Sequence, residues 1–434
     1  MYRETSTPLT IQEQHRQSLR SAGINLTKAI LGVGVLALPK VTALLGLGTT
    51  LIFLFFIAVL TYFSLHYCTV ASSRTGYVRY SDVVREHTGI VGQTFLDISL
   101  IVNSGGVLVI ALMIVGDILV GSGRDQGLLS PECGSRSTVL AVVTIFLLAP
   151  LSSVTRLRSV AATSLLGVVA IVSWAVVTVL LFISAWSNKA LHVIHWWPKG
   201  RFVGHGFESA VQTVATLPVI LFAFICQMSL QHVLRDLQYV RDRQVDRVTG
   251  SSLAICTIAY AAIGVCSYAL FGRHVDADVL LEFTVDALSP MVPEPLAHAC
   301  FLAIRLGFVV SLLGIFPIHI TPLRDAVWKL LFRQELQGPG LWLVSYMLLA
   351  GVYFIATWLP SIWEPLLLIG STAGVGIALI FPGLLAIRTP EILTEPESAR
   401  LGRIIGGSFL LVVGIVSGIS GILRVILYRD PLEG

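Results

Sequence analysis

Charged residues are scarce in this chain of 434 residues, since Asp, Glu, Lys and Arg together make up only 12% of it. Ordinary soluble domains contain about 25% charged residues. Hydrophobic residues reach 55%, and the mean hydropathy is +0.83. A soluble fold cannot hide so much apolar surface behind so few charges. The same composition excludes a disordered chain and a nucleic-acid-binding protein. The sequence therefore predicts an all-α protein that crosses a membrane many times.

Motifs for enzymatic chemistry are also missing. The six cysteines have none of the spacings of a metal site. The sequence contains no phosphate-binding loop and no nucleophile motif with a matching base. The apolar runs are continuous rather than alternating, which argues against a membrane β-barrel. We therefore expect a protein that is not an enzyme, that needs no cofactor or metal and that has no nucleic-acid partner.

About eleven stretches are long and apolar enough to cross a bilayer, which takes about 20 residues each. They lie at about 22–45, 46–71, 95–121, 138–155, 160–186, 208–234, 248–272, 295–322, 341–360, 363–387 and 403–425. Residues 1–21 form a polar tail, and residues 426–434 form a short tail at the other end of the chain. The transmembrane part, 22–425, leaves no room for a separate soluble domain.

Basic residues are distributed unevenly over the predicted loops. Loops on the side of the N-terminus carry about 18 of the 29 Lys and Arg residues, and the opposite loops carry about 9. Because basic loops stay in the cytosol, this bias predicts a cytosolic N-terminus and places 426–434 on the other side. Residues 80–87 are typical of a short amphipathic cytoplasmic helix. The outer loop 273–294 is rich in acidic residues, which either are simply solvated or attract cationic solutes.

Residues 24–39 of the first span contain two glycines and a proline: Gly32, Gly34 and Pro39. Glycine weakens a helix interior, and proline removes a backbone donor. Unpaired backbone is tolerated inside a bilayer only where it is buried in protein or lines a cavity. A break here would expose amides that suit a carboxylate and carbonyls that suit an ammonium or a metal cation. That pairing fits a zwitterionic amino acid. The alternative is close helix packing through small residues.

The sixth span is interrupted by Pro218 and by the polar pair Cys226 and Gln227. Interrupted helices at corresponding positions of two halves indicate a transport site near the bilayer midplane. Phe222 and Phe224 would bound a pocket for the substrate side chain. The predicted substrate-binding residues around the two breaks are Ala29, Leu31, Gly32, Val33, Gly34, Val35, Phe222, Ala223, Phe224 and Cys226.

These motifs resemble those of a known family. Residues 31–39 are similar to the first-helix signature of the amino acid/auxin permease family. Residues 222–227 with 234–237 resemble the sixth helix of its neutral amino acid transporter branch, and 304–306 with Pro317 and 322–324 resemble the eighth.

The resemblance covers about 20–425 and implies a LeuT-like fold with broken helices 1 and 6. It further implies two inverted five-helix repeats, here about 22–186 and 208–387, followed by an extra helix at 403–425. The implied activity is amino acid transport by alternating access.

Lys28 departs from the sodium-coupled members of that branch. There, the resemblance implies an asparagine that helps to hold sodium at the place of Lys28, and threonines in the eighth helix where this chain offers Ser311. An ammonium at this place would repel sodium and satisfy the same carbonyls. We therefore expect sodium-independent transport. The predicted site for the coupling ion or proton consists of Lys28, Asn25 and Ser311. A buried lysine can lose its proton, so proton coupling through Lys28 is the candidate mechanism. The alternative is that Lys28 snorkels to the cytosolic interface.

Other polar residues inside the spans are candidates for the transport pathway. Asn103 and Ser104 in the third span either face the first span or pack against a neighbouring helix. Ser371 begins a small polar stretch in the tenth span that is expected to line the pathway.

Arg305 and two histidines have two interpretations each. Arg305 near the outer end of the eighth span is either a gate residue, paired with an acid such as Glu208, or an interfacial anchor. His232 and His319 are either proton relays or ordinary interface residues.

The sequence thus predicts a secondary transporter of small or medium neutral amino acids, because no acidic side chain lies within the two breaks to attract a cationic substrate. Two alternatives stay open: a carrier of another carboxylate, such as an auxin-like acid, and a membrane protein that senses an amino acid with little flux. The membrane is either the plasma membrane or a vacuolar or lysosomal one. Cys133 and Cys300 both lie near the outer face, where they either pair or stay reduced. The oligomeric state is not indicated.

Overall fold

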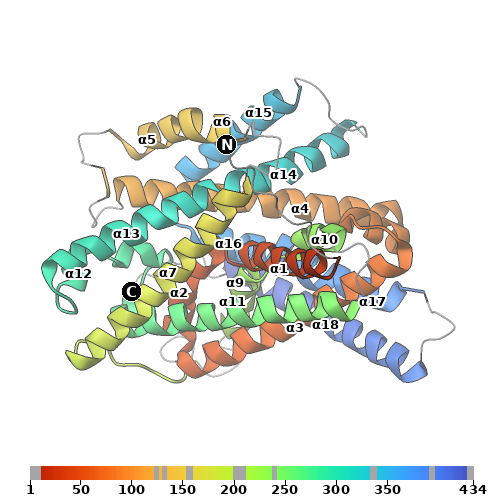
Figure 1. Cartoon of the computed structure of the whole chain (residues 1–434), viewed down its shortest axis with the longest axis horizontal. Helices are drawn as coiled ribbons and strands as arrows, with labels where there is room; N and C mark the ends of the chain where they lie inside the picture. The colour runs from red at the N-terminus through yellow and green to blue at the C-terminus, as the bar shows by residue number, and fades with distance from the viewer. Residues whose placement is uncertain are drawn as a thin grey trace, which may run out of the picture.

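The computed structural model is a bundle of long helices (Figure 1). It describes residues 11–121, 127–129, 134–152, 160–198, 212–236, 242–332, 340–390 and 396–427. Within these residues the chain forms helices and no strand, which confirms the predicted all-α class. Three of the long helices, α3 (Leu47–Thr75), α4 (Tyr80–Val120) and α11 (Asp242–Phe271), have roughly aligned axes across Figure 1.

The remaining elements complete the bundle in chain order. They are α1 (Ile11–Ile30), η1 (Val33–Ala37), α2 (Leu38–Leu45), α5 (Arg136–Val143), η3 (Thr144–Leu148), α6 (Ala149–Ser152), α7 (Val160–Ser187), α9 (Leu217–Ala223), α10 (Gln227–Asp236), η6 (Gly272–His274), η7 (Val279–Glu282), α12 (Val285–Leu288), α13 (Glu294–Leu313), α14 (Ile315–Phe332), α15 (Gly340–Trp358), α16 (Trp363–Ile369), η8 (Gly370–Gly374), η9 (Gly376–Ile380), α17 (Phe381–Arg388) and α18 (Glu397–Leu427).

The described residues contain 9 helices that are long and apolar enough to cross a membrane. The pair Leu19–Ile30 and Val33–Leu45, bent by 45°, raises that number to 10 when it is taken as one span. The shorter apolar helix Arg136–Ser152 occupies the place of the fourth predicted span. The predicted positions therefore match the helices, while the total of eleven spans stays a prediction.

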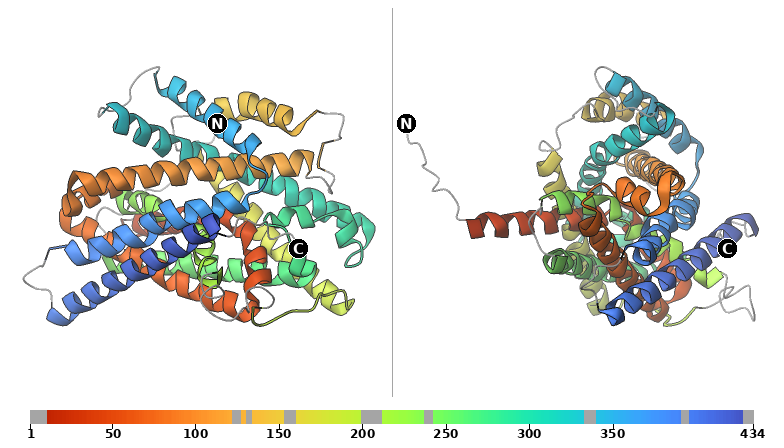
Figure 2. Two further views of the ribbon diagram at one scale, coloured as in Figure 1. Left: turned by 180° about the vertical axis from the view of Figure 1, so that it is seen from behind. Right: turned by 90° about the vertical axis from the view of Figure 1, so that its right-hand side faces the viewer.

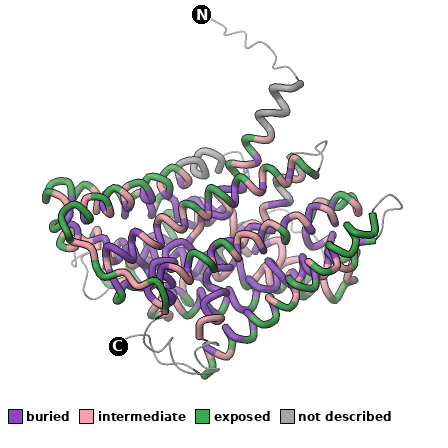
Figure 3. The backbone as a smooth tube through the Cα atoms, turned by 90° about the horizontal axis from the view of Figure 1, so that it is seen from below, coloured by how far each residue is buried: buried purple, intermediate pink, exposed green. Residues whose placement is uncertain are grey.

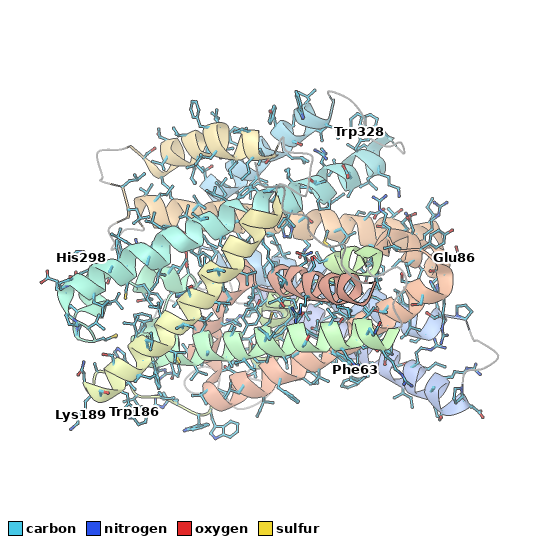
Figure 4. The ribbon with its side chains drawn as sticks, in the orientation of Figure 1. Phe63, Glu86, Trp186, Lys189, His298 and Trp328 are labelled. Carbon is cyan, nitrogen blue, oxygen red and sulfur yellow. The ribbon has the colours of Figure 1, made fainter. Side chains whose placement is uncertain are left out.

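Successive loops gather at opposite ends of the bundle. Trp186, Lys189 and His298, which belong to predicted outer ends, lie together at the left of Figure 4. Glu86 lies at the right-hand end, on the side predicted to be cytosolic. The alternation expected from the span order is therefore present in the fold. We call the end with Lys189 and His298 the outer end and the end with Glu86 the inner end.

Apolar side chains cover the outside of the bundle as well as its interior. Phe55, Phe146, Ile258 and Met347 are each about two-thirds or more exposed, as expected of side chains that face lipid. The buried residues concentrate along the inner faces of the helices (Figure 3). The hydrocarbon of a bilayer replaces water as the solvent for the outer faces, so this exposure carries no hydrophobic penalty.

The predicted short helix at residues 80–87 is present at the start of α4. The chain leaves helical geometry at Gly89, where φ is 73° and ψ is −172°, so the short helix and the long span differ in direction. A positive φ of this size strongly favours glycine. The start of α4 lies at the inner end of the bundle, close to Glu86 (Figure 4).

The first and last described helices, α1 and α18, lie at the edge of the bundle (Figure 2). Viewed along its length, α1 projects from the side of the bundle (Figure 2, right). α18 packs along α17 (Figure 2, left). α11 lies beside α1, α2 and α3, so it touches both halves of the bent first span.

Candidate functional site

The first span is broken where the sequence predicts it. α1 ends at Ile30, Gly32 is extended with φ −124° and ψ −161°, and the 3-10 helix η1 starts at Val33. The last amide of the first half-helix, that of Leu31, still donates to the carbonyl of Thr27 at 2.9 Å. The carbonyl of Ile30 then has no amide one turn further along to bond with, because the helix does not continue. The break therefore leaves backbone groups inside the bundle that need other partners.

The sixth span is broken at Phe224–Cys226, between α9 and α10. The Gln227 side chain stabilises this break from within. Its Oε1 accepts a hydrogen bond from the amide of Cys226 at 3.1 Å, and its Nε2 donates to Oγ of Ser64 in α3 at 3.1 Å. Gln227 is 1% exposed, so both bonds are made in the protein interior. Although this span contains no glycine, the side-chain amide of Gln227 therefore stabilises its break.

The two breaks touch each other directly. A Cβ atom built on Gly34 would lie 2.7 Å from the Cα of Ala223 and 2.9 Å from its Cβ. Only glycine therefore fits at position 34 with this spacing. Gly32 differs, because the nearest atom to its Cβ position is the carbonyl oxygen of Ile30 at 3.8 Å. The structure thus brings together the two predicted groups of substrate-binding residues.

Tyr260 of α11 joins the two breaks, and the sequence reasoning missed it. Its hydroxyl donates to the carbonyl of Ile30, at the end of α1, and lies 2.9 Å from the carbonyl of Ala223, at the end of α9. The ring is fully buried and packs edge-on against Phe224 with centroids 5.1 Å apart. The signal for it in the sequence was a tyrosine hydroxyl within a largely apolar span.

Most of the predicted substrate-binding residues are buried at this meeting point. Ala29 and Gly32 are partly exposed. The others are buried: Leu31, Val33, Gly34, Val35, Phe222, Ala223, Phe224 and Cys226. Phe222 is 6% exposed and lies in the last turn of α9, just before the second break. The rings of Phe222 and Phe224 are thus positioned at the site, as expected for side chains that bound a pocket.

Lys28 lies in the last turn of α1, two residues before the end of the half-helix, and is partly exposed. Its charge acts on His319 of α14, so these two residues from the first and eighth spans lie near each other. Nδ1 of His319 is buried and has no hydrogen-bond partner among the described residues. The sequence considered both residues for proton coupling but did not predict that they are neighbours.

The other predicted members of the coupling site are placed differently. Asn25, one turn before Lys28, is exposed. Ser311 is buried in α13, and its hydroxyl donates to the carbonyl of Gly167 in α7 at 3.4 Å. Ser311 is thus bonded to the fifth span. The structure describes the backbone of His232, which lies in α10, but not the side chain of His232.

The pathway candidates divide between two places. Asn103 and Ser104 are buried in α4, and Oγ of Ser104 lies 3.9 Å from the sulfur of Met228, just after the second break. Oδ1 of Asn103 is buried without a hydrogen-bond partner in the described part of the chain. The hydroxyl of Ser371 instead bonds its own helix, at the carbonyl of Leu367, and its Cβ faces Gly421 of α18. The structure therefore brings Ser104 to the second break, whereas the side chain of Ser371 faces α18.

Arg305 is fully buried at the outer end, with its guanidinium 4.4 Å from the centre of the Phe301 ring. Its expected partner Glu208 lies outside the described residues, as does Cys133. A different acid, Asp278 of the outer loop, interacts electrostatically with Arg305. Asp278 is 2% exposed and accepts a hydrogen bond from the amide of Leu280 at 3.0 Å, where it caps η7.

Asp278, in a loop outside the spans, belongs to a group of charges at the outer end of the bundle. Burial is the main cause that raises the pKa of Asp278 well above its ordinary value, and the nearby charge of Asp117 adds to it. Asp117 in turn pairs with Arg136 of α5 at 2.8 Å. The loop that carries Asp278 was expected either to be solvated or to attract cationic solutes, and in the structure its segment η7 packs against η1 and α4. It therefore covers the outer side of the first break.

The site is closed at its outer side and less covered on the side of α1. Residues 33–39, after the break, are all buried. Before the break, Asn25 is exposed, Ile24 is 49% exposed, and Lys28 and Ala29 are partly exposed. No cluster of three or more His, Cys, Asp or Glu side chains suited to a metal ion occurs among the described residues. The polar groups described at the site include backbone carbonyls and amides, the phenol of Tyr260, the side-chain amide of Gln227 and the amine of Lys28.

Comparisons with known proteins agree with this geometry. Residues 15–427 match the family described as "Transmembrane amino acid transporter protein". The chain is 29% identical to "Amino acid transporter AVT6E" of Arabidopsis thaliana, over 85% of this chain and 75% of that protein. It is 25% identical to "Vacuolar amino acid transporter 5" of Schizosaccharomyces pombe, over 84% and 83%. It is 24% identical to human "Sodium-coupled neutral amino acid transporter 7", over 77% and 70%.

Solved structures with the same fold are transporters of other solutes. The manganese transporter of Eremococcus coleocola superimposes with a TM-score of 0.61 at 12% sequence identity, covering 99% of this chain and 92% of that one. A Na+-coupled sialic acid symporter superimposes with a TM-score of 0.55 at 14% identity, covering 94% and 89%. These matches confirm the LeuT-like fold that the motifs implied.

Proposed function

The chain belongs to the transmembrane amino acid transporter family, the amino acid/auxin permeases that its motifs resemble, and from this membership we propose that it is a secondary transporter of small or medium neutral amino acids. Its relatives and structural neighbours are transporters and not enzymes. The protein is a multi-pass membrane protein, consistent with its apolar helices.

The observation that carries the proposal is the meeting of two interrupted helices at Gly34 and Ala223. The first break offers backbone amides at the start of η1, which suit the substrate carboxylate. The carbonyls of Ile30 and Ala223 suit the α-ammonium group. Within the breaks there is no acidic side chain that would favour a cationic substrate, and Phe222 and Phe224 provide an apolar boundary. A neutral amino acid fits these groups best.

Alternating access is supported by the unequal exposure of the site. η7 covers the first break from the outer end, while the residues of α1 before the break are partly or fully exposed. Transport then requires that η7 withdraw and that α1 close against the bundle in the opposite state. We assign the inner end to the cytosol because of the basic loops there.

Lys28 supports coupling to protons rather than to sodium. Lys28 lies in the last turn of α1, two residues before Ile30, whose carbonyl would otherwise attract a cation. An ammonium at this place opposes sodium binding through like-charge repulsion. Its charge also acts electrostatically on His319 of α14, the other residue considered for proton coupling. A relative named as sodium-coupled is 24% identical, so the coupling ion of this chain must be measured directly.

Uptake by the purified protein in liposomes tests the proposal. A pool of labelled neutral L-amino acids is offered with a sodium gradient or a pH gradient, imposed separately. We expect uptake that inward protons drive and that sodium does not change. Lys28→Arg keeps the charge but does not release its proton. It should therefore lose the stimulation by protons and still ignore sodium. Lys40→Asn removes the other lysine of this span and should behave like the native protein.

The outcomes separate the parts of the proposal. Sodium-driven uptake by the native protein would contradict the role of Lys28 and leave amino acid transport intact. Uptake of an auxin-like acid without uptake of amino acids would favour the alternative carrier. Binding of an amino acid without flux would favour a sensor.

Labelling of cysteine variants from one side of the membrane tests the proposed orientation. We propose a vacuolar, lysosomal or plasma membrane with the N-terminus in the cytosol, since the fission yeast relative is named as vacuolar. Glu86→Cys and Asp286→Cys place thiols at exposed positions of opposite ends. An impermeant maleimide added from the cytosol should label only the first of these, and labelling of Asp286→Cys from that side would reverse the orientation.

A further inference from the structure

Tyr260 occupies the point where a substrate ammonium would bind, and its hydroxyl already contacts both carbonyls. It donates to the carbonyl of Ile30 and lies 2.9 Å from that of Ala223, each the last residue of the half-helix before a break. The side chain is fully buried, and Phe224 holds its ring.

A phenol satisfies these carbonyls less completely than an ammonium does. A hydroxyl has one hydrogen, whereas an ammonium has three N–H donors. Two buried carbonyls therefore share one donor when the site is empty and receive separate donors when an amino acid is bound. A buried carbonyl without any donor lowers the stability of the state that contains it. While no substrate is present, the hydroxyl of Tyr260 contacts both carbonyls and so avoids most of this loss of stability.

We propose that the Tyr260 hydroxyl takes the place of the substrate α-amino group in the empty carrier and so allows the empty carrier to change sides. The inference rests on the proposed function, because it requires a substrate with an α-amino group. Tyr260 is then a positioning residue for the return step, in which both breaks pass through a closed form without substrate. The loaded carrier does not need the hydroxyl, because the substrate ammonium supplies the donors.

This role predicts that loss of the hydroxyl affects net uptake and exchange differently, which a purely structural role does not predict. Net uptake requires the empty carrier to return, whereas exchange of external for internal amino acid uses only the loaded carrier. Loss of the hydroxyl should therefore slow net uptake and spare exchange. A residue that only supports the fold would affect the two modes equally.

The test compares Tyr260→Phe with Tyr268→Phe in liposomes. Tyr268 lies in the same helix, is 1% exposed and accepts a hydrogen bond from the amide of His195 at 3.3 Å, away from both breaks. Labelled neutral L-amino acids are supplied outside, and the liposomes contain either buffer or the unlabelled pool. We expect Tyr260→Phe to lower net uptake about ten-fold, the effect of leaving one buried carbonyl without a donor, and to change exchange by less than about two-fold. Tyr268→Phe should lower the two modes in equal proportion, if at all.

Two results would overturn the inference: equal loss of both modes in Tyr260→Phe, or no loss of either. The native protein provides a second measurement that does not depend on folding of the variant. Propionate has the carboxylate of alanine without its amine, so external propionate should not drive release of internal amino acid. Release as fast as with external alanine would contradict the exchange of hydroxyl for ammonium. Native protein that carries no amino acid in either mode would instead refute the proposed function.

Discussion

At the scale of single residues, Gly34 determines how closely the two broken spans approach each other. A methyl group at this position would lie 2.7 Å from a backbone atom of Ala223, and backbone cannot swing aside as a long side chain can. Glycine is needed here for its lack of a side chain. The neighbouring Gly32 has room for a Cβ and an extended backbone that any residue can adopt.

Gly34→Ala should therefore damage the site, while Gly32→Ala should not. Forcing a methyl group into a packed interior costs about 1–3 kcal/mol. We expect Gly34→Ala to lower the thermal unfolding temperature of the purified protein and to reduce amino acid uptake at least ten-fold. Gly32→Ala serves as the matched control, with an unchanged unfolding temperature. Equal effects of the two substitutions would show that the spacing between the breaks differs from the one described.

At the scale of helices, α18 packs against the tenth span through glycines. The Cβ position of Gly407 lies 2.7 Å from Cβ of Ala386 and 2.8 Å from the carbonyl oxygen of Gly383. Small residues allow backbones to approach closely inside a membrane, where no hydrophobic force drives helices together. The extra helix thus depends on shape complementarity with α17 for its place in the bundle.

Gly407→Val should weaken this contact, and Gly402→Val is its control. Both substitutions place the same β-branched side chain in the same helix, but the Cβ position of Gly402 has no atom within 4 Å. We expect Gly407→Val to cost about 1–3 kcal/mol more than Gly402→Val, seen as a lower unfolding temperature in detergent. If the two variants unfolded at the same temperature, α18 would not be held through this contact.

At the scale of the whole molecule, the outer end is closed by a loop whose buried acid is Asp278. The groups that face it are Asp117 of α4, Asp276 of the same loop and Arg305 of α13. Asp117 and Asp276 disfavour the ionised form, as burial does, and Arg305 favours it. Protonation of Asp278 therefore stabilises the closed outer end.

The pH dependence of stability follows from the raised pKa of Asp278. Below the ordinary aspartate pKa of about 4, the group is protonated in both the folded and the unfolded chain, and burial has no charge penalty. As the pH rises from there towards the raised pKa, the unfolded chain ionises first, so the folded chain loses up to about 1.4 kcal/mol of stability per pH unit. Above the raised pKa the loss stays constant.

Asp278→Asn should remove this loss, because asparagine does not ionise. We expect the unfolding temperature of the variant to exceed that of the native protein by an amount that grows with pH above about 4. Asp286→Asn removes an exposed acid from the same loop and should follow the native curve. If the unfolding temperatures of the native protein and of Asp278→Asn changed in parallel with pH, Asp278 would not be the group that holds the proton.

Several features of this protein were readable from its amino-acid order. The all-α membrane class follows from long apolar runs with few charges, because a bilayer accepts little else. The broken first span followed from Gly32, Gly34 and Pro39, and the sixth from Pro218 and Gln227. These are local properties, in which neighbouring residues decide whether a helix continues.

Tertiary structure decided the contacts between spans. Tyr260 bonds a carbonyl 230 residues away, and Gln227 bonds Ser64 at a separation of 163 residues. Such contacts depend on which helices are neighbours and on how each is rotated about its axis. Periodicity does not reveal the rotation of a helix that is apolar on all sides. For the same reason the sequence did not indicate that Ser371 faces α18, that Asp278 is buried near Arg305, or that Lys28 and His319 are neighbours.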